Sequence, residues 1–245
     1  MTKVLVIIDN IQQYDRIKSL VELKGRTDVE FIYKHSPVKS GIWEHEDFIA
    51  KADSVINVKT QISEILQEYN LVISIHCFQF FPEELVNNIR CINVHPGYNP
   101  LNRGWYPQVF AIVHNLVIGA TIHEIDNKLD NGPIIARDFV EIYDWDTSYT
   151  IYNRVLDKEM ELLDLHFNSI IDGTYDRIRP ESKGNLFKKK DFHALCKLDM
   201  KEKGTFEDFY NRLRALTHGE YKNAYFINSE GHKVYLSLNI EIEKS

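Results

Sequence analysis

The chain has 245 residues, of which 44% are hydrophobic and 27% charged, and its formal net charge at pH 7 is −7. This length allows one larger domain with a small appendage, or two modest domains. The acidic balance argues against a nucleic-acid partner, because nucleic-acid-binding proteins normally carry a basic excess. No apolar run is long enough to span a bilayer, so we expect no membrane association.

The N-terminus and the cysteines together indicate a compartment. The chain begins with a strand-like apolar run that is too short for a signal peptide and lacks a small-residue cleavage site. Cys77, Cys91 and Cys196 are few and odd in number, as is usual where thiols stay reduced. We therefore expect a cytoplasmic protein.

The first part of the chain alternates apolar runs with helical patterns. Apolar and β-branched runs predict strands over residues 3–9, 29–33, 54–58, 71–75 and 91–94. Apolar residues at helical spacing predict a helix from Tyr14 to a stop at Gly25, a second capped by Thr60, and a short third starting at Pro82. Strands separated by helices predict right-handed crossovers and a mostly parallel sheet.

The rest of the chain changes in character near residue 173. Before this point we predict strands over 119–125 and 133–142, and helices over 108–114 and 148–171. A polar linker follows over 173–190, then a helix over 206–216 and a hairpin of strands 224–228 and 233–243. We therefore predict a Rossmann-like α/β domain over residues 1–180 and a small α+β C-terminal domain over residues 181–245.

Polar residues follow three of the predicted strands. Asp9 and Asn10 end the first strand, residues 76–78 end another, and residues 93–95 end the last of the parallel set. Ligands of open α/β sheets gather at the carboxyl ends of the strands. These residues are therefore expected on one edge of the sheet, where a site is most common.

Three of the polar residues can build an acyl-transfer site. The amide of Asn93 can donate a hydrogen bond to a developing oxyanion. The imidazole of His95 can move protons near neutral pH, and the carboxylate of Asp130 can fix its tautomer. Asn-x-His alone is a weak signal, but Asp130 lies in a second turn-rich loop, and several polar groups converging on one sheet edge indicate a site.

The spacing of these residues resembles a known family. The pattern comprises Asn93-x-His95, Arg103-Gly104, Gly119-Ala120-Thr121-Ile122-His123, Asp126 and Leu129-Asp130-x-Gly132-Pro133-Ile134. It is similar to the 10-formyltetrahydrofolate-dependent formyltransferases. Segments 95–108 and 211–226 resemble the branch of this family that formylates dTDP-linked amino-dideoxy sugars. The resemblance covers most of the chain and is strongest over 91–135 and 206–228.

The resemblance implies a role for each residue of the pattern. Asn93 would stabilise the oxyanion, His95 would help the folate nitrogen leave, and Asp130 would orient His95 and accept the amine proton. No metal would be needed, and the formyl donor would be 10-formyltetrahydrofolate. Folate would contact Phe78, Phe80, Ile125, Asp126 and Asn127. The sugar nucleotide would contact Asn10, Gln79, Gly97, Asn99, Arg103, Trp105 and Tyr221, with Tyr221 stacked on thymine.

Several of these residues also have a purely structural interpretation. Core packing would explain Phe78 and Phe80 equally well, and turn formation alone would explain Asn10. His123 could line the site, although nothing in the sequence requires it. His76 and Cys77 alternate in direction and cannot easily bind one metal ion.

Two positions depart from the family pattern. Gly97 stands where the wider family often has serine, which fits the sugar branch and allows close approach of a substrate. Phe78 stands where the sugar branch often carries lysine. The pyrophosphate of a sugar nucleotide would therefore lack one expected cation, which leaves the identity of that sugar nucleotide open.

The expected reaction is formylation of dTDP-4-amino-4,6-dideoxyglucose for a surface polysaccharide such as O-antigen, by a homodimer. A dTDP-3-amino-3,6-dideoxyhexose is an alternative acceptor. A formyltetrahydrofolate hydrolase would use the same three residues with water in place of the amine, and would be expected to carry an extra regulatory domain. A non-catalytic sugar-nucleotide-binding module is a third alternative, although a pure binder has no use for Asn93, His95 and Asp130.

Overall fold

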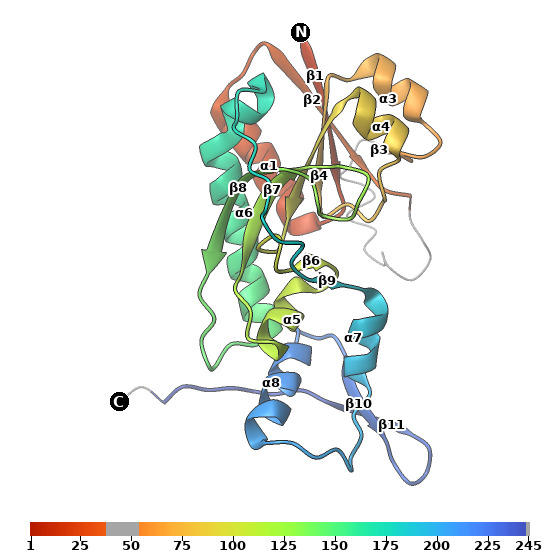
Figure 1. The fold of residues 1–245 in the computed structure, drawn as a ribbon, viewed down its shortest axis with the longest axis vertical. Coiled ribbons are helices and arrows are strands. Elements are labelled where there is room, and N and C mark those ends of the chain that lie inside the picture. The colour runs from red at the N-terminus through yellow and green to blue at the C-terminus, as the bar shows by residue number, and fades with distance from the viewer. Residues whose placement is uncertain (38–53, 244–245) are drawn as a thin grey trace. The chain divides into compact units, whose positions relative to one another are not determined.

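The computed structural model describes residues 1–37 and 54–243. The protein has an α/β fold (Figure 1). The strands are β1 Thr2–Ile8, β2 Val29–His35, β3 Ser54–Val55, β4 Leu71–Ile75, β5 Arg90–His95, β6 Arg103–Gly104, β7 Ile118–Glu124, β8 Ile134–Val140, β9 Leu186–Phe187, β10 Ala224–Ile227 and β11 Lys233–Leu236. The helices are α1 Ile11–Lys24, α3 Ile62–Glu68, α4 Glu83–Asn88, α5 Pro107–Val113, α6 Ser148–Asp172, α7 Lys189–Cys196 and α8 Phe206–Leu216.

Seven strands form the main sheet in the order β3-β2-β1-β4-β5-β7-β8. β1 pairs in parallel with β2 and β4, and β4 pairs in parallel with β5. β7 is antiparallel to β5, with Asn93 opposite His123. The predicted mostly parallel sheet is confirmed, and the carboxyl ends of β1, β4 and β5 meet at one edge.

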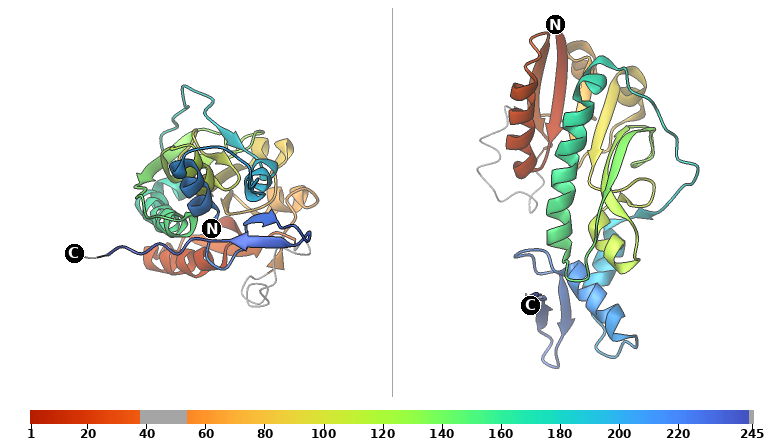
Figure 2. Two further views of the ribbon diagram at one scale, coloured as in Figure 1. Left: turned by 90° about the horizontal axis from the view of Figure 1, so that it is seen from below. Right: turned by 90° about the vertical axis from the view of Figure 1, so that its left-hand side faces the viewer.

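The sheet is covered by helices on both faces. On one face, α3 and α4 pack on alternate residues of the strands, among them Leu5, Val72 and Cys91. Helices α1 and α6 cover the other face (Figures 1 and 2). Tyr14 and Ile17 of α1 and Phe167 of α6 are buried. Because β1 and β4 are buried on both faces, their sequences are nearly continuous apolar runs rather than alternating ones.

Four predicted boundaries were wrong. Thr60 does not cap α3, because that helix begins after Gln61, which makes no side-chain cap bond. The third strand is only Ser54–Val55, and the hairpin strand predicted to reach residue 243 ends at Leu236. The segment predicted as a linker contains β9 and the start of α7. β9 pairs with β6, which is far away along the chain, and local sequence patterns do not reveal such a pairing.

The chain divides into two compact units. Unit 1 comprises residues 1–95, 121–137 and 159–181, and unit 2 comprises residues 96–120, 138–158 and 182–245, so the chain passes between them several times. Unit 1 contains most of the main sheet, and unit 2 contains the hairpin β10–β11 and helices α5, α7 and α8. Within the described ranges, no helix is long and apolar enough to cross a membrane.

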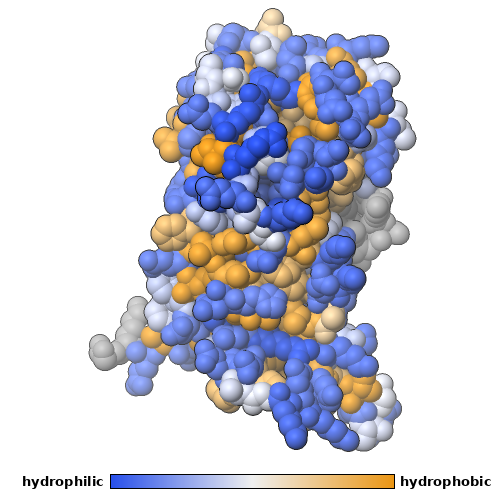
Figure 3. Space-filling view, in the orientation of Figure 1, coloured by the Kyte–Doolittle hydropathy of each residue, from blue (hydrophilic) through white to orange (hydrophobic). Residues whose placement is uncertain are grey.

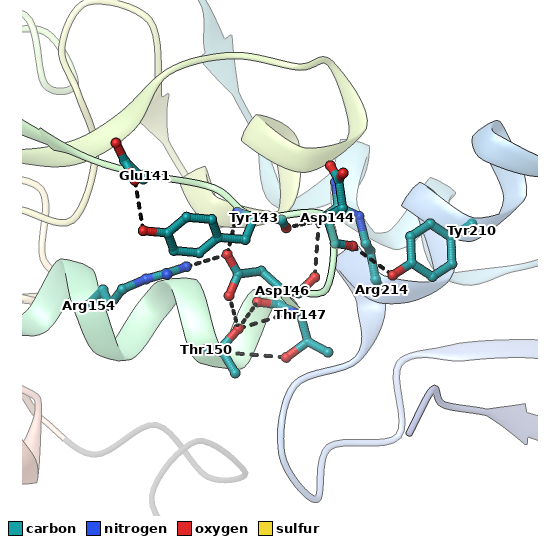
Figure 4. A network of polar contacts seen from close by, with 9 residues as sticks. All are labelled: Glu141, Tyr143, Asp144, Asp146, Thr147, Thr150, Arg154, Tyr210 and Arg214. Carbon is teal, nitrogen blue, oxygen red and sulfur yellow. Dashed lines mark hydrogen bonds and ion pairs between the residues drawn. The ribbon is translucent and has the colours of Figure 1, made fainter. Parts of the chain in front are cut away.

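In unit 2 a polar network joins α8 to the segment before α6 (Figure 4). The buried carboxylate of Asp146 accepts hydrogen bonds from Tyr143 N at 2.6 Å and Thr150 Oγ1 at 2.8 Å, and it pairs with Arg154. Arg214 of α8 donates to the carbonyl oxygens of Tyr143 and Asp146 at 3.0 and 3.1 Å. The C-terminal elements are therefore held by buried polar contacts as well as by apolar packing.

Candidate active site

The structure brings together the three predicted catalytic side chains. Asn93 and His95 lie at the carboxyl end of β5, and Asp130 lies in the loop between β7 and β8. Asn93 Nδ2 is 3.3 Å from Asp130 Oδ1, and His95 Nδ1 is 3.6 Å from Asp130 Oδ2. The side chains of His95 and Asp130 are only 5% and 9% exposed, so charges at this site are weakly screened by water.

A hydroxyl group on the neighbouring strand orients Asn93. Ser74 lies opposite Asn93 in the β4–β5 register, and its Oγ donates to Asn93 Oδ1 at 2.9 Å. Because the carbonyl oxygen of the amide is held by Ser74, the NH₂ group is directed toward Asp130. An amide held in this way presents a donor to the site without reorganisation, which is the requirement for an oxyanion stabiliser.

His123, which the sequence left as a residue that could line the site, lies beside Asn93. It lies opposite Asn93 on β7, is 2% exposed, and its Nε2 is 3.3 Å from Asn93 Nδ2. Its Nδ1 is 2.7 Å from the carbonyl oxygen of Glu124, which can only accept, so Nδ1 carries the proton. In the neutral ring, Nε2 is therefore an acceptor that faces the Asn93 amide. The antiparallel register places it there.

The loop that carries Asp130 is shaped by its own side chains. Asp126 accepts hydrogen bonds from Lys128 N at 2.9 Å and from Asn131 Nδ2 at 2.8 Å. Asp130 has a φ of 47°, a left-handed conformation that Asp tolerates better than most residues. Gly132 then lets the chain pass the carbonyl oxygen of Glu124, where an added Cβ would lie only 1.8 Å away.

We therefore expect Gly132→Ala to disturb this loop. The clash is with backbone rather than with a movable side chain, so the free energy of unfolding should fall by about 1–3 kcal/mol. Urea unfolding measures this change. Gly25→Ala is the control for activity: its φ of 59° strains an alanine, but nothing lies within 4 Å of the added Cβ, so it should lose stability and leave activity unchanged. Equal activity of both variants would contradict our account of the loop.

The predicted folate contacts lie on two loops of unit 1. Phe78 and Phe80 follow β4 and are 42% and 48% exposed, which is uncommon for phenylalanine and provides apolar walls for a flat ligand. Core packing, the structural alternative for both residues, is therefore not observed. Ile125 follows β7, and its backbone N donates to the carbonyl oxygen of Cys91 at 2.8 Å. Asp126 and Asn127 come next in that loop, and Asn127 is exposed.

Two predicted substrate contacts in unit 1 make local hydrogen bonds. Asn10 caps α1, with its Oδ1 accepting from Gln12 N and Gln13 N at 2.9 and 3.1 Å. Gln79 accepts from Val58 N at 2.9 Å and donates to Ser36 Oγ and to the carbonyl oxygen of Ile56, both at 2.9 Å. These bonds give each residue a structural role, and their contact with substrate stays a prediction.

Four predicted substrate contacts in unit 2 lie close together along the chain. Gly97 and Asn99 are buried, and Arg103 and Trp105 are partly exposed on either side of Gly104. Gly104 has a φ of 95°, and an added Cβ would lie 2.1 Å from the carbonyl oxygen of Phe187, so only glycine allows β6 to pair with β9. Lys189 Nζ lies 3.8 Å from the centre of the Trp105 ring, a cation–π contact.

Tyr221, the remaining predicted substrate contact, is 71% exposed in unit 2. Its ring lies 5.8 Å from that of His218, which also contacts Tyr149 and Tyr152. Burial lowers the pKa of His218, so the ring is uncharged near neutral pH. An exposed tyrosine supported by the His218 ring can stack on a flat base.

A second buried polar cluster lies beside the site. Glu159 of α6 is fully buried, and its Oε2 accepts from Gln13 Nε2 at 2.6 Å and lies 2.8 Å from His76 Nε2. His76 has a φ of 52°, a left-handed conformation directly after β4. The sequence assigned His76 no role and did not connect it with Glu159, which is 83 residues away.

The described residues, 1–37 and 54–243, contain no group of three His, Cys, Asp or Glu side chains that could hold a metal ion. A cysteine nucleophile is not supported either. Burial, and then the charge of Asp9, raises the pKa of Cys77 to about 12, so its thiol stays protonated near neutral pH. The polar groups that meet around Asn93 are an amide, two imidazoles and a carboxylate, which are groups that an acyl-transfer site can use.

Comparison with known proteins identifies the class. The formyl transferase family model matches residues 7–165, and the N-formyltransferase dimerization C-terminal domain model matches residues 191–242. The chain therefore belongs to the formyl transferase family and is a folate-dependent formyltransferase. It is 50% identical over 188 residues to the dTDP-4-amino-4,6-dideoxyglucose formyltransferase of Mycobacterium tuberculosis strain H37Rv, an alignment covering 77% of this chain and 80% of that protein.

Solved structures place it among the sugar N-formyltransferases. A sugar N-formyltransferase from Shewanella sp FDAARGOS_354 superposes with a TM-score of 0.94 at 41% identity over 100% of both chains. A 4-N formyltransferase from Francisella tularensis gives 0.91 at 35% identity over 99% of both. The formyltransferase PseJ from Anoxybacillus kamchatkensis, solved with tetrahydrofolate, shares the fold at 23% identity, with a TM-score of 0.60 over 78% of this chain and 88% of that one.

Proposed function

We propose that this enzyme transfers the formyl group of 10-formyltetrahydrofolate to the amine of dTDP-4-amino-4,6-dideoxyglucose. The observation that carries the proposal is that Asp130 lies 3.3 Å from the Asn93 amide and 3.6 Å from the His95 ring nitrogen, at the carboxyl edge of the sheet. The 50% identical M. tuberculosis relative, named for this sugar nucleotide, supports the choice of acceptor.

When bound, the folate would supply the activated formyl carbon. Asn93, held by Ser74, would donate its N–H to the developing negative charge on the formyl oxygen. Asp130 would accept the proton lost by the attacking amine and keep the His95 ring oriented. His95 would deliver a proton toward the leaving nitrogen. These roles use only groups that the structure holds at one site.

The ligand contacts are proposed as two groups. Folate would lie against the exposed rings of Phe78 and Phe80 and the backbone of residues 125–127, where apolar walls and backbone hydrogen-bonding groups suit a pterin. The sugar nucleotide would contact Asn10, Gln79, Gly97, Asn99, Arg103, Trp105 and Tyr221, with Tyr221 on the thymine ring. Aromatic–base stacking of this kind contributes about 1–3 kcal/mol.

The quaternary and cellular context follows from the same proposal. We propose a homodimer, which the match of residues 191–242 to a dimerization domain supports. Hydrophobic side chains reach the surface in patches among charged ones (Figure 3). Within residues 191–242, the exposed hydrophobic side chains include Met200, Phe206 and Ile227. Residues 1–180 would form the catalytic domain and residues 181–245 the small second domain. The enzyme would act in the cytoplasm, where its three free cysteines stay reduced. Its product would serve the synthesis of a surface polysaccharide such as O-antigen.

A mass-shift assay tests the function. Purified enzyme and 10-formyltetrahydrofolate should add one formyl mass to dTDP-4-amino-4,6-dideoxyglucose, with a much lower kcat/KM for dTDP-3-amino-3,6-dideoxy sugars. Preference for a 3-amino sugar would correct the acceptor and keep the chemistry. Formate released at full rate without any sugar nucleotide would identify a hydrolase instead. Binding of the sugar nucleotide with no product of either kind would identify a non-catalytic module.

A further inference from the structure

A buried carboxylate lies directly behind the exposed phenylalanine loop. Asp9, the residue after β1, is 3% exposed. Its Oδ2 accepts hydrogen bonds from Phe78 N at 2.8 Å and Ser36 Oγ at 2.5 Å, and its Oδ1 accepts from Ser36 N at 2.8 Å. The carboxylate thus joins the ends of β1, β2 and β4 through one side chain.

Gln79 extends this arrangement to the segment after β3. Its Nε2 donates to Ser36 Oγ, and its Oε1 accepts from Val58 N. The backbone N of Gln79 also lies 3.4 Å from Cys77 Sγ. The backbone of residues 77–79 is therefore fixed at two successive amides and one side chain. We call Asp9, Ser36 and Gln79 the Asp9 clamp.

The clamp fixes a loop whose side chains point out of the protein. Phe78 and Phe80 alternate with the anchored Gln79 and are 42% and 48% exposed, so a large part of each side chain is accessible to a ligand. A buried carboxylate is costly unless its oxygens are fully hydrogen-bonded, and here three donors satisfy it. Such an arrangement suits a loop that must be ordered before a ligand arrives.

We infer that Asp9 is a positioning residue for the formyl donor, acting through the backbone of Phe78. This inference rests on the proposed function, because it assigns the ligand of Phe78 and Phe80 as the folate. Asp9 touches neither substrate. Its carboxylate holds the loop in the conformation that receives the pterin, so that binding the folate does not require ordering the loop.

Steady-state kinetics with Asp9→Asn separates this role from general stability. The amide cannot accept all three hydrogen bonds, so the KM for 10-formyltetrahydrofolate should rise about 10-fold or more. The kcat at saturating folate should stay within about 3-fold. The KM for the sugar nucleotide should rise by less than the donor KM, because Gln79, a proposed sugar-nucleotide contact, keeps its bonds to Val58 N and to the carbonyl oxygen of Ile56. Asp164→Asn is the matched control: this exposed carboxylate pairs with Lys24, and its loss should change none of these constants.

A double-mutant cycle tests the route of action. If Asp9 works through the phenylalanine loop, Phe78→Ala should raise the donor KM, and adding Asp9→Asn should raise it by less than the product of the two effects. Ser36→Ala removes one hydrogen bond to Asp9, so it should also raise the donor KM, but by less than Asp9→Asn does. This variant keeps the test valid if Asp9→Asn folds poorly. Multiplicative effects, or equal loss of kcat/KM for both substrates, would overturn the inference.

Two measurements distinguish this inference from the proposed function. Tetrahydrofolate binding by calorimetry needs no sugar: if the wild-type enzyme binds it and Asp9→Asn weakens the binding about 10-fold, the inference stands even if the acceptor is a different amine. Hydrogen exchange of the Phe78 amide, followed by NMR, should be slow in the wild type and faster in Asp9→Asn. A wild-type protein that binds no folate, or unchanged exchange in the variant, would overturn it.

Discussion

Replacing Asn93 with alanine is expected to lower kcat for formyl transfer by about 10²–10³, the loss typical of removing one oxyanion donor. The reason is geometric, because Ser74 holds the carbonyl end of the Asn93 amide and its NH₂ group is the donor directed into the site. The KM values should change little, since the bond forms fully only in the transition state. Single-turnover formylation measures the chemical step directly.

Two comparisons make the Asn93 result interpretable. Ser74→Ala should lower kcat in the same direction but by less, because the amide remains and only its orientation is released. The thermal unfolding midpoint of Asn93→Ala should stay near that of the wild type, since Asn93 is only partly buried. A kcat within about 3-fold of the wild type would show that Asn93 does not stabilise the oxyanion.

Asp130→Asn is expected to lower kcat by about 10²–10⁴, the range of general acid–base contributions. Asparagine has the same shape and tolerates the left-handed conformation of residue 130, where φ is 47°, so the loop should keep its path. What the substitution removes is the negative charge beside His95 and the base for the amine proton. The dependence of kcat on pH measures this loss.

The pH profile provides the decisive readout for Asp130. A carboxylate that acts as a base contributes a rise of kcat with pH on the acid side, and Asp130→Asn should lack this limb. Asp138→Asn is the matched control, because Asp138 is a partly exposed carboxylate whose pKa is lowered by Lys158. A pH profile of unchanged shape in Asp130→Asn would assign the proton transfer to another group.

Much of the fold could be predicted from local patterns. β1 and β4 are apolar runs buried on both faces, and such runs are distinctive even in a single sequence. Asn93, His95 and Asp130 could be found from the sequence. An amide and an imidazole at a strand end, together with a carboxylate in a glycine-containing loop, are rarely explained by a purely structural role. Their catalytic roles stay predictions that the two variants above test.

What the sequence did not show depends on pairing between distant segments. Ser74 meets Asn93 through the β4–β5 register, and His123 meets it through an antiparallel pairing that no local period specifies. The sequence places Asp9 at the sheet edge and Gln79 among the substrate contacts, but the bonds that join them through Ser36 depend on the pairing of β1 with β2 and β4. The lysines at the start of α7 predict a solvated linker, whereas the structure has a helix there from Lys189.

The antiparallel pairing of β5 with β7 has a consequence for folding. Asn93 and Asp130 are 37 residues apart, whereas Gln13 and Glu159, which bond beside the same site, are 146 apart. Closing the shorter loop costs less chain entropy, and contacts of low sequence separation form faster. During synthesis, every residue of the candidate catalytic cluster has left the ribosome once residue 130 has emerged, before α6 and the C-terminal elements emerge.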